Sequence, residues 1–245
     1  MKPFLLLVSR SEESIAEAEY AAFCELSGLA PDDLIRIRLE RGSMPPIDLE
    51  RYSGVMVGGS PFNSSDPIEQ KSEIQLRVET DIARLLDDAV ERDFPFLGAC
   101  YGIGTLTTHE GGIVDRQFGE PLSSIPVTLT DEGAADPVFV GMPRQFDAFV
   151  GHKEACSLLP AGATLLATGE TCPVQAYRVK ENLYATQFHP EMKAPDLVER
   201  AREYRHHGYF APDELDATIA AIESAAPVNW PSHILRNFAE RYATA

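Results

Sequence analysis

The pattern of apolar and polar residues divides the chain into two unlike halves. In the first half, short apolar runs alternate with amphipathic stretches whose apolar residues recur at helical spacing. The order strand, helix, strand, strand, helix, strand predicts an open, mainly parallel twisted sheet with helices on both faces, an α/β fold. The predicted elements are strands at 4–8, 34–39, 52–57 and 94–99 and helices at 11–26 and 69–92.

After Gly112 the pattern changes to short strands separated by Gly, Pro and Asn turns, which predicts a smaller antiparallel β region. No linker separates the two halves, so we predict a single domain over residues 1–245. A helical pattern returns near the end of the chain and forms an extended helical segment at 193–230. The predicted strands are 125–130, 146–150, 164–168, 174–179 and 183–188, and the predicted helices are 196–207, 212–224 and 232–242.

The strand at 94–99 runs into Gly98-Ala99-Cys100-Tyr101-Gly102, and a mostly uncharged segment follows. Small residues around a central nucleophile are typical of a strained turn between a strand and a helix. The positive end of the helix dipole would favour the thiolate of Cys100. The alternative is a buried structural cysteine.

Two further stretches place chemistry at strand ends. Gly58-Gly59 follows the strand at 52–57, where adjacent glycines allow close approach to a ligand or simply form a tight turn. His189-Pro190-Glu191 ends the last strand, and residues i and i+2 of an extended segment project to the same side. Histidine is the usual base for a cysteine nucleophile, and a carboxylate fixes its tautomer. The alternative is a plain strand-end turn.

Composition narrows the partners and the compartment. The formal net charge of −17 disfavours nucleic acid and anionic membranes as partners. The apolar run at 4–8 is shorter than a secretory signal requires, and no stretch approaches the length of a membrane span. We therefore expect a cytoplasmic protein. The four cysteines show no zinc-binding spacing and are expected to be free thiols; we expect no metal and no cofactor.

Taken together and in this order, these motifs resemble those of class I (triad-type) glutamine amidotransferases. The similarity extends to the glutaminase domain of GMP synthase and its free-standing homologues, and it spans residues 4–192. It implies a flavodoxin-like fold and a catalytic triad of Cys100, His189 and Glu191. It also implies an oxyanion hole formed by the backbone N–H groups of Gly59 and Tyr101.

The resemblance further implies which residues meet the substrate. Gly58 and the backbone of Phe149, Val150 and Gly151 fall where the family binds the amino-acid end of glutamine. His152, next along the chain, is read either as catalytic or as a structural residue at the rim.

The sequence departs from the family pattern at Gly104 and at the segment 193–230. Gly104 stands where the family has a substrate-binding glutamine, and we expect more room and fewer hydrogen bonds there. The segment 193–230 is longer than in the family and contains a basic, aromatic stretch at 202–210. That stretch is read as a lid over Cys100, as a docking face, or as a solvated helix end.

We therefore predict a glutaminase that releases ammonia from glutamine through a cysteine γ-glutamyl thioester. Since the chain carries no P-loop and no synthase domain, the ammonia would pass to a separate synthase subunit. One alternative is a γ-glutamyl peptide or amide hydrolase with the same triad. Another is a catalytically silent binding homologue, against which the intact triad argues.

Overall fold

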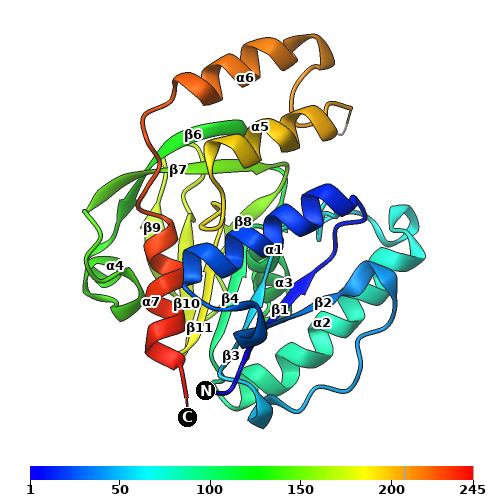
Figure 1. Ribbon diagram of the computed structural model, residues 1–245, viewed down its shortest axis with the longest axis vertical. Helices are drawn as coiled ribbons and strands as arrows, with labels where there is room; N and C mark the ends of the chain where they lie inside the picture. The colour runs from blue at the N-terminus through cyan, green and yellow to red at the C-terminus, as the bar shows by residue number, and fades with distance from the viewer. Residues whose placement is uncertain (207, 245) are drawn as a thin grey trace.

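The computed structural model describes residues 1–206 and 208–244. Its strands are β1 (Phe4–Val8), β2 (Leu34–Arg38), β3 (Gly54–Val57), β4 (Phe96–Ala99), β5 (Ile113–Asp115), β6 (Glu120–Leu129), β7 (Gln145–His152), β8 (Ala155–Leu158), β9 (Thr164–Thr168), β10 (Ala176–Val179) and β11 (Leu183–Thr186). Nine of them form one twisted sheet in the order β2-β1-β3-β4-β11-β10-β9-β6-β7, and β5 pairs with β8 (Figure 1). The strands from β2 to β11 pair in parallel, and those from β11 to β7 pair antiparallel.

Helices cover both faces of the sheet, so the predicted α/β fold class is confirmed. They are α1 (Glu13–Ser27), α2 (Glu73–Glu91), α3 (Tyr101–His109), α4 (Asp131–Ala135), α5 (Ala194–Glu203), α6 (Leu215–Ser224) and α7 (Ser232–Tyr242). α1 and α7 lie side by side on one face of the sheet, and α2 and α3 cover the other (Figure 1).

The sequence of β1 is apolar throughout because both faces of this strand are buried. All five of its residues are buried. Successive side chains of a strand point to opposite faces. Phe4, Leu6 and Val8 accordingly enter the core that α1 and α7 close, whereas Leu5 and Leu7 enter the core under α2 and α3. Burial on both faces is what a parallel strand between two helical layers requires.

The element boundaries differ from the predictions at a few points. α2 begins at Glu73 because the hydroxyl of Ser72 caps it, accepting a hydrogen bond from the N–H of Gln75 at 3.1 Å. The helix predicted at 196–207 is α5, which begins and ends earlier; His207 lies outside the described residues. The elements β5, β8 and α4 were not predicted, because each is short and contains polar or small residues that do not form a continuous apolar run.

The predicted helical segment 193–230 is packed against the sheet. α5 and α6 lie across the end of the sheet that β6 and β7 form (Figure 1). A small core joins them to β7 and includes Phe149, Met192, Leu197 and Ile222. The segment is therefore held close to the carboxyl-terminal ends of the parallel strands. Among the described helices, none is long and apolar enough to cross a bilayer.

Candidate active site

Cys100 occupies a strained turn between β4 and α3. Its backbone angles are φ 53° and ψ −91°, a conformation that L-residues rarely adopt. The N–H of Cys100 donates to the carbonyl of Thr186 at 2.8 Å and so fixes the turn to β11. A Cβ at Gly98 would lie 2.6 Å from the carbonyl carbon of Gly102, so the turn requires glycine at Gly98. The sequence predicted this strained geometry, and the structure has it.

His189 and Glu191 are in direct contact. His189 Nδ1 lies 2.7 Å from Glu191 Oε1, and both residues are buried. The carboxylate accepts from Nδ1–H, so Nε2 is the nitrogen left for Cys100. The predicted reason for this contact was wrong, however. Residues 190 and 191 form a turn and not an extended segment, and the turn brings the two side chains together.

The charges around this pair shift both pKa values. Burial by itself would lower the pKa of His189, but the charges of Glu191 and Cys100 and their hydrogen bonds raise it to about 9. Burial by itself would raise the pKa of Glu191, but His189 and then Arg200 outweigh it and lower that pKa to about 2. The site therefore favours an imidazolium held by a carboxylate.

The two glycines after β3 lie against this cluster. A Cβ at Gly59 would come within 2.9 Å of His189 Cε1 and 2.7 Å of an Arg10 nitrogen, which places Gly59 beside the histidine. The N–H of Gly58 donates to the carbonyl of Leu7 at 3.0 Å and is occupied within the sheet. Tyr101 is the first residue of α3, where backbone N–H groups have no intrahelical acceptor.

A small cavity of about 20 Å³ lies over Cys100, which is room for about one water and for no amino acid. Tyr209, from the segment 193–230, forms part of its wall, and Lys153 Nζ lies 4.9 Å from the centre of the Tyr209 ring. The lining residues are Ser60, Phe62, Asn63, Cys100, Tyr101, Gly151, His152, Lys153, Glu154, Gln187 and Tyr209.

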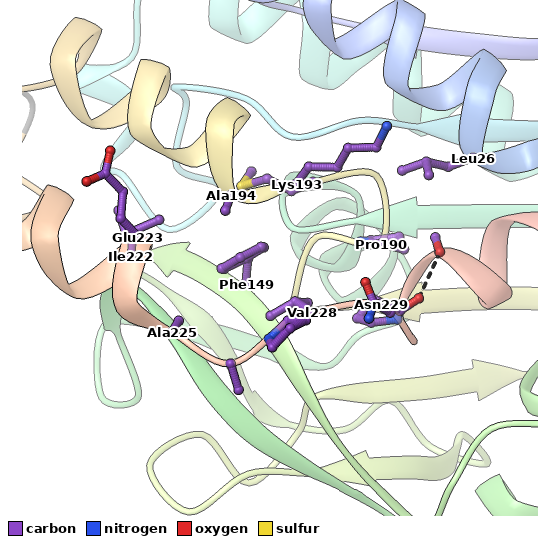
Figure 2. A pocket seen from close by; sticks show the side chains of 15 residues that line it. Leu26, Phe149, Pro190, Lys193, Ala194, Ile222, Glu223, Ala225, Val228 and Asn229 are labelled. Carbon is purple, nitrogen blue, oxygen red and sulfur yellow. Dashed lines mark hydrogen bonds between the residues drawn. The ribbon is translucent and has the colours of Figure 1, made fainter.

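Of the residues predicted to bind substrate on β7, Gly151 lines this cavity. The carbonyl of Phe149 instead accepts from the N–H of His189 at 3.0 Å, and Val150 is buried in the core that α1 and α7 close. The side chain of Phe149 lines a larger pocket of about 340 Å³ between α5, α6 and α7, shown in Figure 2. Pro190 also lines this larger pocket, so the pocket borders the turn that follows His189.

The space beside Gly104 is filled, so the expectation of more room is wrong. A Cβ at Gly104 would lie 2.9 Å from Ser64 Oγ and 3.5 Å from Glu154 Oε1. Glu154 accepts from the N–H groups of Ser64 and Ser65 at 2.6 and 2.8 Å, which holds this loop against α3. The loop thus stands where a longer side chain would project.

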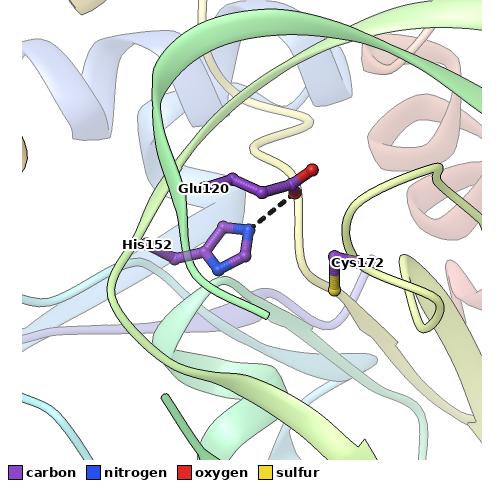
Figure 3. Close-up of side chains that lie close together, drawn as sticks. All are labelled: Glu120, His152 and Cys172. Carbon is purple, nitrogen blue, oxygen red and sulfur yellow. Dashed lines mark hydrogen bonds and ion pairs between the residues drawn. The ribbon is translucent and has the colours of Figure 1, made fainter. Parts of the chain in front are cut away.

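His152 lines the cavity over Cys100, and its ring also belongs to a buried cluster, drawn in Figure 3. Its Nδ1–H donates to the carbonyl of Glu154 at 2.9 Å, and its Nε2 lies 2.9 Å from Glu120 Oε2. The thiol of Cys172 is close by, and Gln175 donates to the same Glu120 oxygen at 2.8 Å. Glu120, His152 and Cys172 are the group of described residues whose donor atoms lie near enough together to share a metal ion.

Sequence reasoning missed Arg200, and it included Tyr209 only as part of the stretch 202–210, for which a lid over Cys100 was one of three readings. Arg200 Nη2 lies 3.4 Å from Glu191 Oε1, and Tyr209 reaches the cavity over Cys100. Both come from the segment 193–230, and the signals in the sequence were its extra length and its basic, aromatic stretch at 202–210. The reading of 202–210 as a plain solvated helix end does not hold for Tyr204, which is buried, or for Tyr209.

Comparison with known proteins agrees with this geometry. The family model "Glutamine amidotransferase class-I" matches residues 33–200. GMP synthase of Thermosipho africanus is 34% identical over 115 residues, which are 46% of this chain and 22% of that protein. One of the GMP synthase subunits of Thermococcus kodakarensis is 35% identical over 109 residues, 44% of this chain and 56% of that protein. The aligned part is therefore less than two thirds of either relative.

Solved structures share the fold over nearly the whole chain. A glutamine amidotransferase of Thermotoga maritima superposes with a TM-score of 0.72 at 20% identity, covering 99% of this chain and 98% of that one. One from Methylobacillus flagellatus gives 0.73 at 18% identity, covering 100% and 97%. With the family model matching more than half of its residues, this chain belongs to the class I glutamine amidotransferases.

Proposed function

We propose that the chain hydrolyses the γ-carboxamide of glutamine through a thioester on Cys100 and passes the ammonia to a separate synthase subunit. The observation that carries the proposal is the pair His189–Glu191, joined at 2.7 Å, with the charge of Cys100 acting on the same imidazole. A strained cysteine beside a carboxylate-held histidine is the arrangement that thiol acyl transfer needs.

The steps follow from the positions of these groups. The thiolate of Cys100 attacks the amide carbon of glutamine, and a negative tetrahedral oxygen forms. The C–N bond then breaks while His189 gives its proton to the leaving nitrogen, so ammonia and a γ-glutamyl thioester result. Water attacks the thioester as His189 takes its proton, and cleavage of the C–S bond releases glutamate and restores the thiolate.

The backbone N–H groups of Gly59 and Tyr101 are proposed to bind the tetrahedral oxygen. Gly59 lies beside His189, and Tyr101 begins the helix that follows Cys100. Both therefore lie at the same edge of the sheet as the nucleophile. Preorganised donors at this position are worth roughly 3 kcal/mol each in acyl transfer.

The cavity of about 20 Å³ is too small for glutamine, so turnover requires lining residues to move, and we propose that Tyr209 is one of them. This makes access to Cys100 a property of the segment 193–230. A synthase partner is supported by the relative from Thermococcus kodakarensis, whose name makes it one component of a GMP synthase assembly.

The γ-glutamyl hydrolase is retained as a second candidate because Ser64 and Glu154 stand where the family has a substrate-binding glutamine. A site that presents different hydrogen-bonding groups selects a different substrate. The candidate substrate is then a γ-glutamyl peptide or amide.

The test is release of glutamate and ammonia by the purified chain, offered glutamine and then a panel of γ-glutamyl dipeptides. Cys100→Ser serves as the control. Turnover of glutamine that disappears in the control supports the glutaminase. Turnover of the dipeptides alone supports the hydrolase. If neither is cleaved while iodoacetamide still alkylates Cys100, the chain does not act as a glutaminase without a partner.

A further inference from the structure

A row of buried, alternating charges lies behind His189 and Glu191. Arg200 Nη2 lies 3.4 Å from Glu191 Oε1 and 3.1 Å from Glu19 Oε1. Arg10 Nε binds the same oxygen of Glu19 at 3.0 Å. Each of these side chains is exposed by 7% or less. The row joins α1, α5 and the turn after β11, elements far apart in the sequence.

The row is electrically balanced only when Arg200 is present. The charges of Arg10 and Arg200 balance those of Glu19 and Glu191 beside the imidazole of His189. Without Arg200 the remaining groups carry a net negative charge. In a buried site that excess acts on His189 with little screening by solvent.

The proposed reaction needs His189 in two protonation states. It must be an imidazolium when ammonia leaves and a neutral imidazole when it activates water. Glu191 Oε1 accepts from both His189 and Arg200, so its negative charge is divided between them. A carboxylate that served the histidine alone would hold the imidazolium more firmly and delay the second step.

We propose that Arg200 is a positioning residue of this active site: by sharing Glu191 Oε1 with His189, it keeps the imidazole able to lose its proton. The proposal rests on the proposed function for the role of His189 as acid and base. It assigns the segment 193–230 a direct part in the chemistry, beyond access to Cys100.

Other charged and titratable groups also face His189. Cys100 lies on its open side, and Arg10 approaches the same face of Gly59 as the His189 ring. The hydroxyl of Tyr204 accepts from Arg10 Nη1 at 3.0 Å, and Tyr209 lies beside Cys100. Arg200 Nη1 also lies 3.5 Å from His189 Nδ1, and Arg200 differs from the other groups because it contacts Glu191 as well.

The experiment is an NMR titration of His189 in the full chain, labelled at histidine and assigned with His189→Asn. In Arg200→Met the titration midpoint should rise by about one pH unit, because a positive charge near the imidazole is lost. Arg200→Lys should restore most of the wild-type value. Arg202→Met, at an exposed arginine of the same helix, should leave it unchanged.

A second variant, Glu19→Gln, is expected to shift the titration midpoint of His189 in the opposite direction. Glu19→Gln removes a negative charge and lets Arg200 engage Glu191 fully, so the midpoint should fall. Opposite shifts in the two variants are what a merely structural role would not produce. An unchanged midpoint in Arg200→Met overturns the proposal. If Glu19→Gln does not fold, the difference in midpoint between Arg200→Met and Arg200→Lys tests the proposal by itself.

The titration needs no turnover, so the outcome is separate from that of the proposed function. If the chain does hydrolyse glutamine, Arg200→Met should also lower kcat by about ten-fold and lower KM with it, because the thioester accumulates when its hydrolysis becomes slow. A rise in KM at constant kcat would mean that Arg200 acts on binding and would overturn the assigned role.

Discussion

Two buried histidines of this protein each contact a glutamate at a similar distance, but their other ring nitrogens meet different groups. His189 meets Glu191 at 2.7 Å, and His152 meets Glu120 at 2.9 Å. The two residues differ in the partner of the ring nitrogen that does not contact the glutamate. In His152 it is committed to the carbonyl of Glu154, whereas in His189 it faces Cys100. A histidine–carboxylate pair is therefore a candidate for catalysis only where the other ring nitrogen meets a reacting group.

The surroundings of the two pairs reinforce the difference. Gln175 adds a further hydrogen bond to Glu120, so that pair is tied into a fixed polar network. Glu191 is shared with Arg200, and His189 borders the strained turn at Cys100. We expect the first pair to contribute to stability and the second to contribute to chemistry.

The largest expected effect is the loss of activity in His189→Asn. Removing the base of an acyl-transfer triad lowers kcat by about 10⁴-fold or more. The measurement is glutamate release under saturating glutamine, with circular dichroism to show that the fold is kept. Activity within ten-fold of wild type would show that His189 is not the catalytic base and that the two histidines do not differ in this respect.

The matching change in the other pair is His152→Phe, which keeps the ring volume and leaves Glu120 buried without its partner. We expect a loss of about 3–5 kcal/mol in the free energy of unfolding, measured in urea, since an unpaired buried charge is costly. kcat per folded molecule should stay within ten-fold. A collapse of kcat with unchanged stability would show that His152 is the catalytic histidine.

The pH dependence of stability should sharpen the contrast. The pKa of His189 is raised from 6.5 to about 9, so its contribution to stability is complete below pH 6.5 and is lost as the pH rises through 9. Wild type should lose up to about 3 kcal/mol more than His189→Asn over this range. The measurement is the free energy of unfolding in urea at pH 6 and at pH 9.5 for both proteins. An equal change in wild type and in His189→Asn between these two pH values would contradict the raised pKa.

The smallest expected effect concerns access. Tyr209 lines the cavity over Cys100, so Tyr209→Ala should expose the thiol and speed its alkylation by iodoacetamide about ten-fold, an increase equivalent to about 1.4 kcal/mol. Tyr52→Ala, at a tyrosine remote from this cavity, is the matched control. An unchanged rate would mean that Tyr209 does not limit access to Cys100.

Several features of the site could be predicted from the sequence because they depend on local chain geometry. The turn at Cys100 follows from small residues between a buried strand and a helix. The contact of His189 with Glu191 was also predicted, although a local turn and not an extended segment makes it. The order of strands and helices likewise sets the α/β class. Such relations involve a few neighbouring residues, which one stretch of sequence contains in full.

Other features depended on contacts between distant segments. The sequence favoured open space beside Gly104, but Ser64 and Glu154 fill it, 40 and 50 residues away along the chain. No periodicity indicates which loop will fold over a glycine. The antiparallel strands were expected as a smaller region, and pairing across β11 and β10 decided that they extend the parallel sheet.

The sequence by itself determined the family, and it indicated the proposed nucleophile Cys100 and the partner of His189, because these are encoded in short motifs. Only the tertiary structure decided that Arg200 joins Glu19 to Glu191 and that Tyr209 lines the cavity over Cys100. The physical reason is that a buried charge must find its partner wherever packing brings one. For Glu191 and Glu19 that partner came from a helix packed on the far end of the sheet.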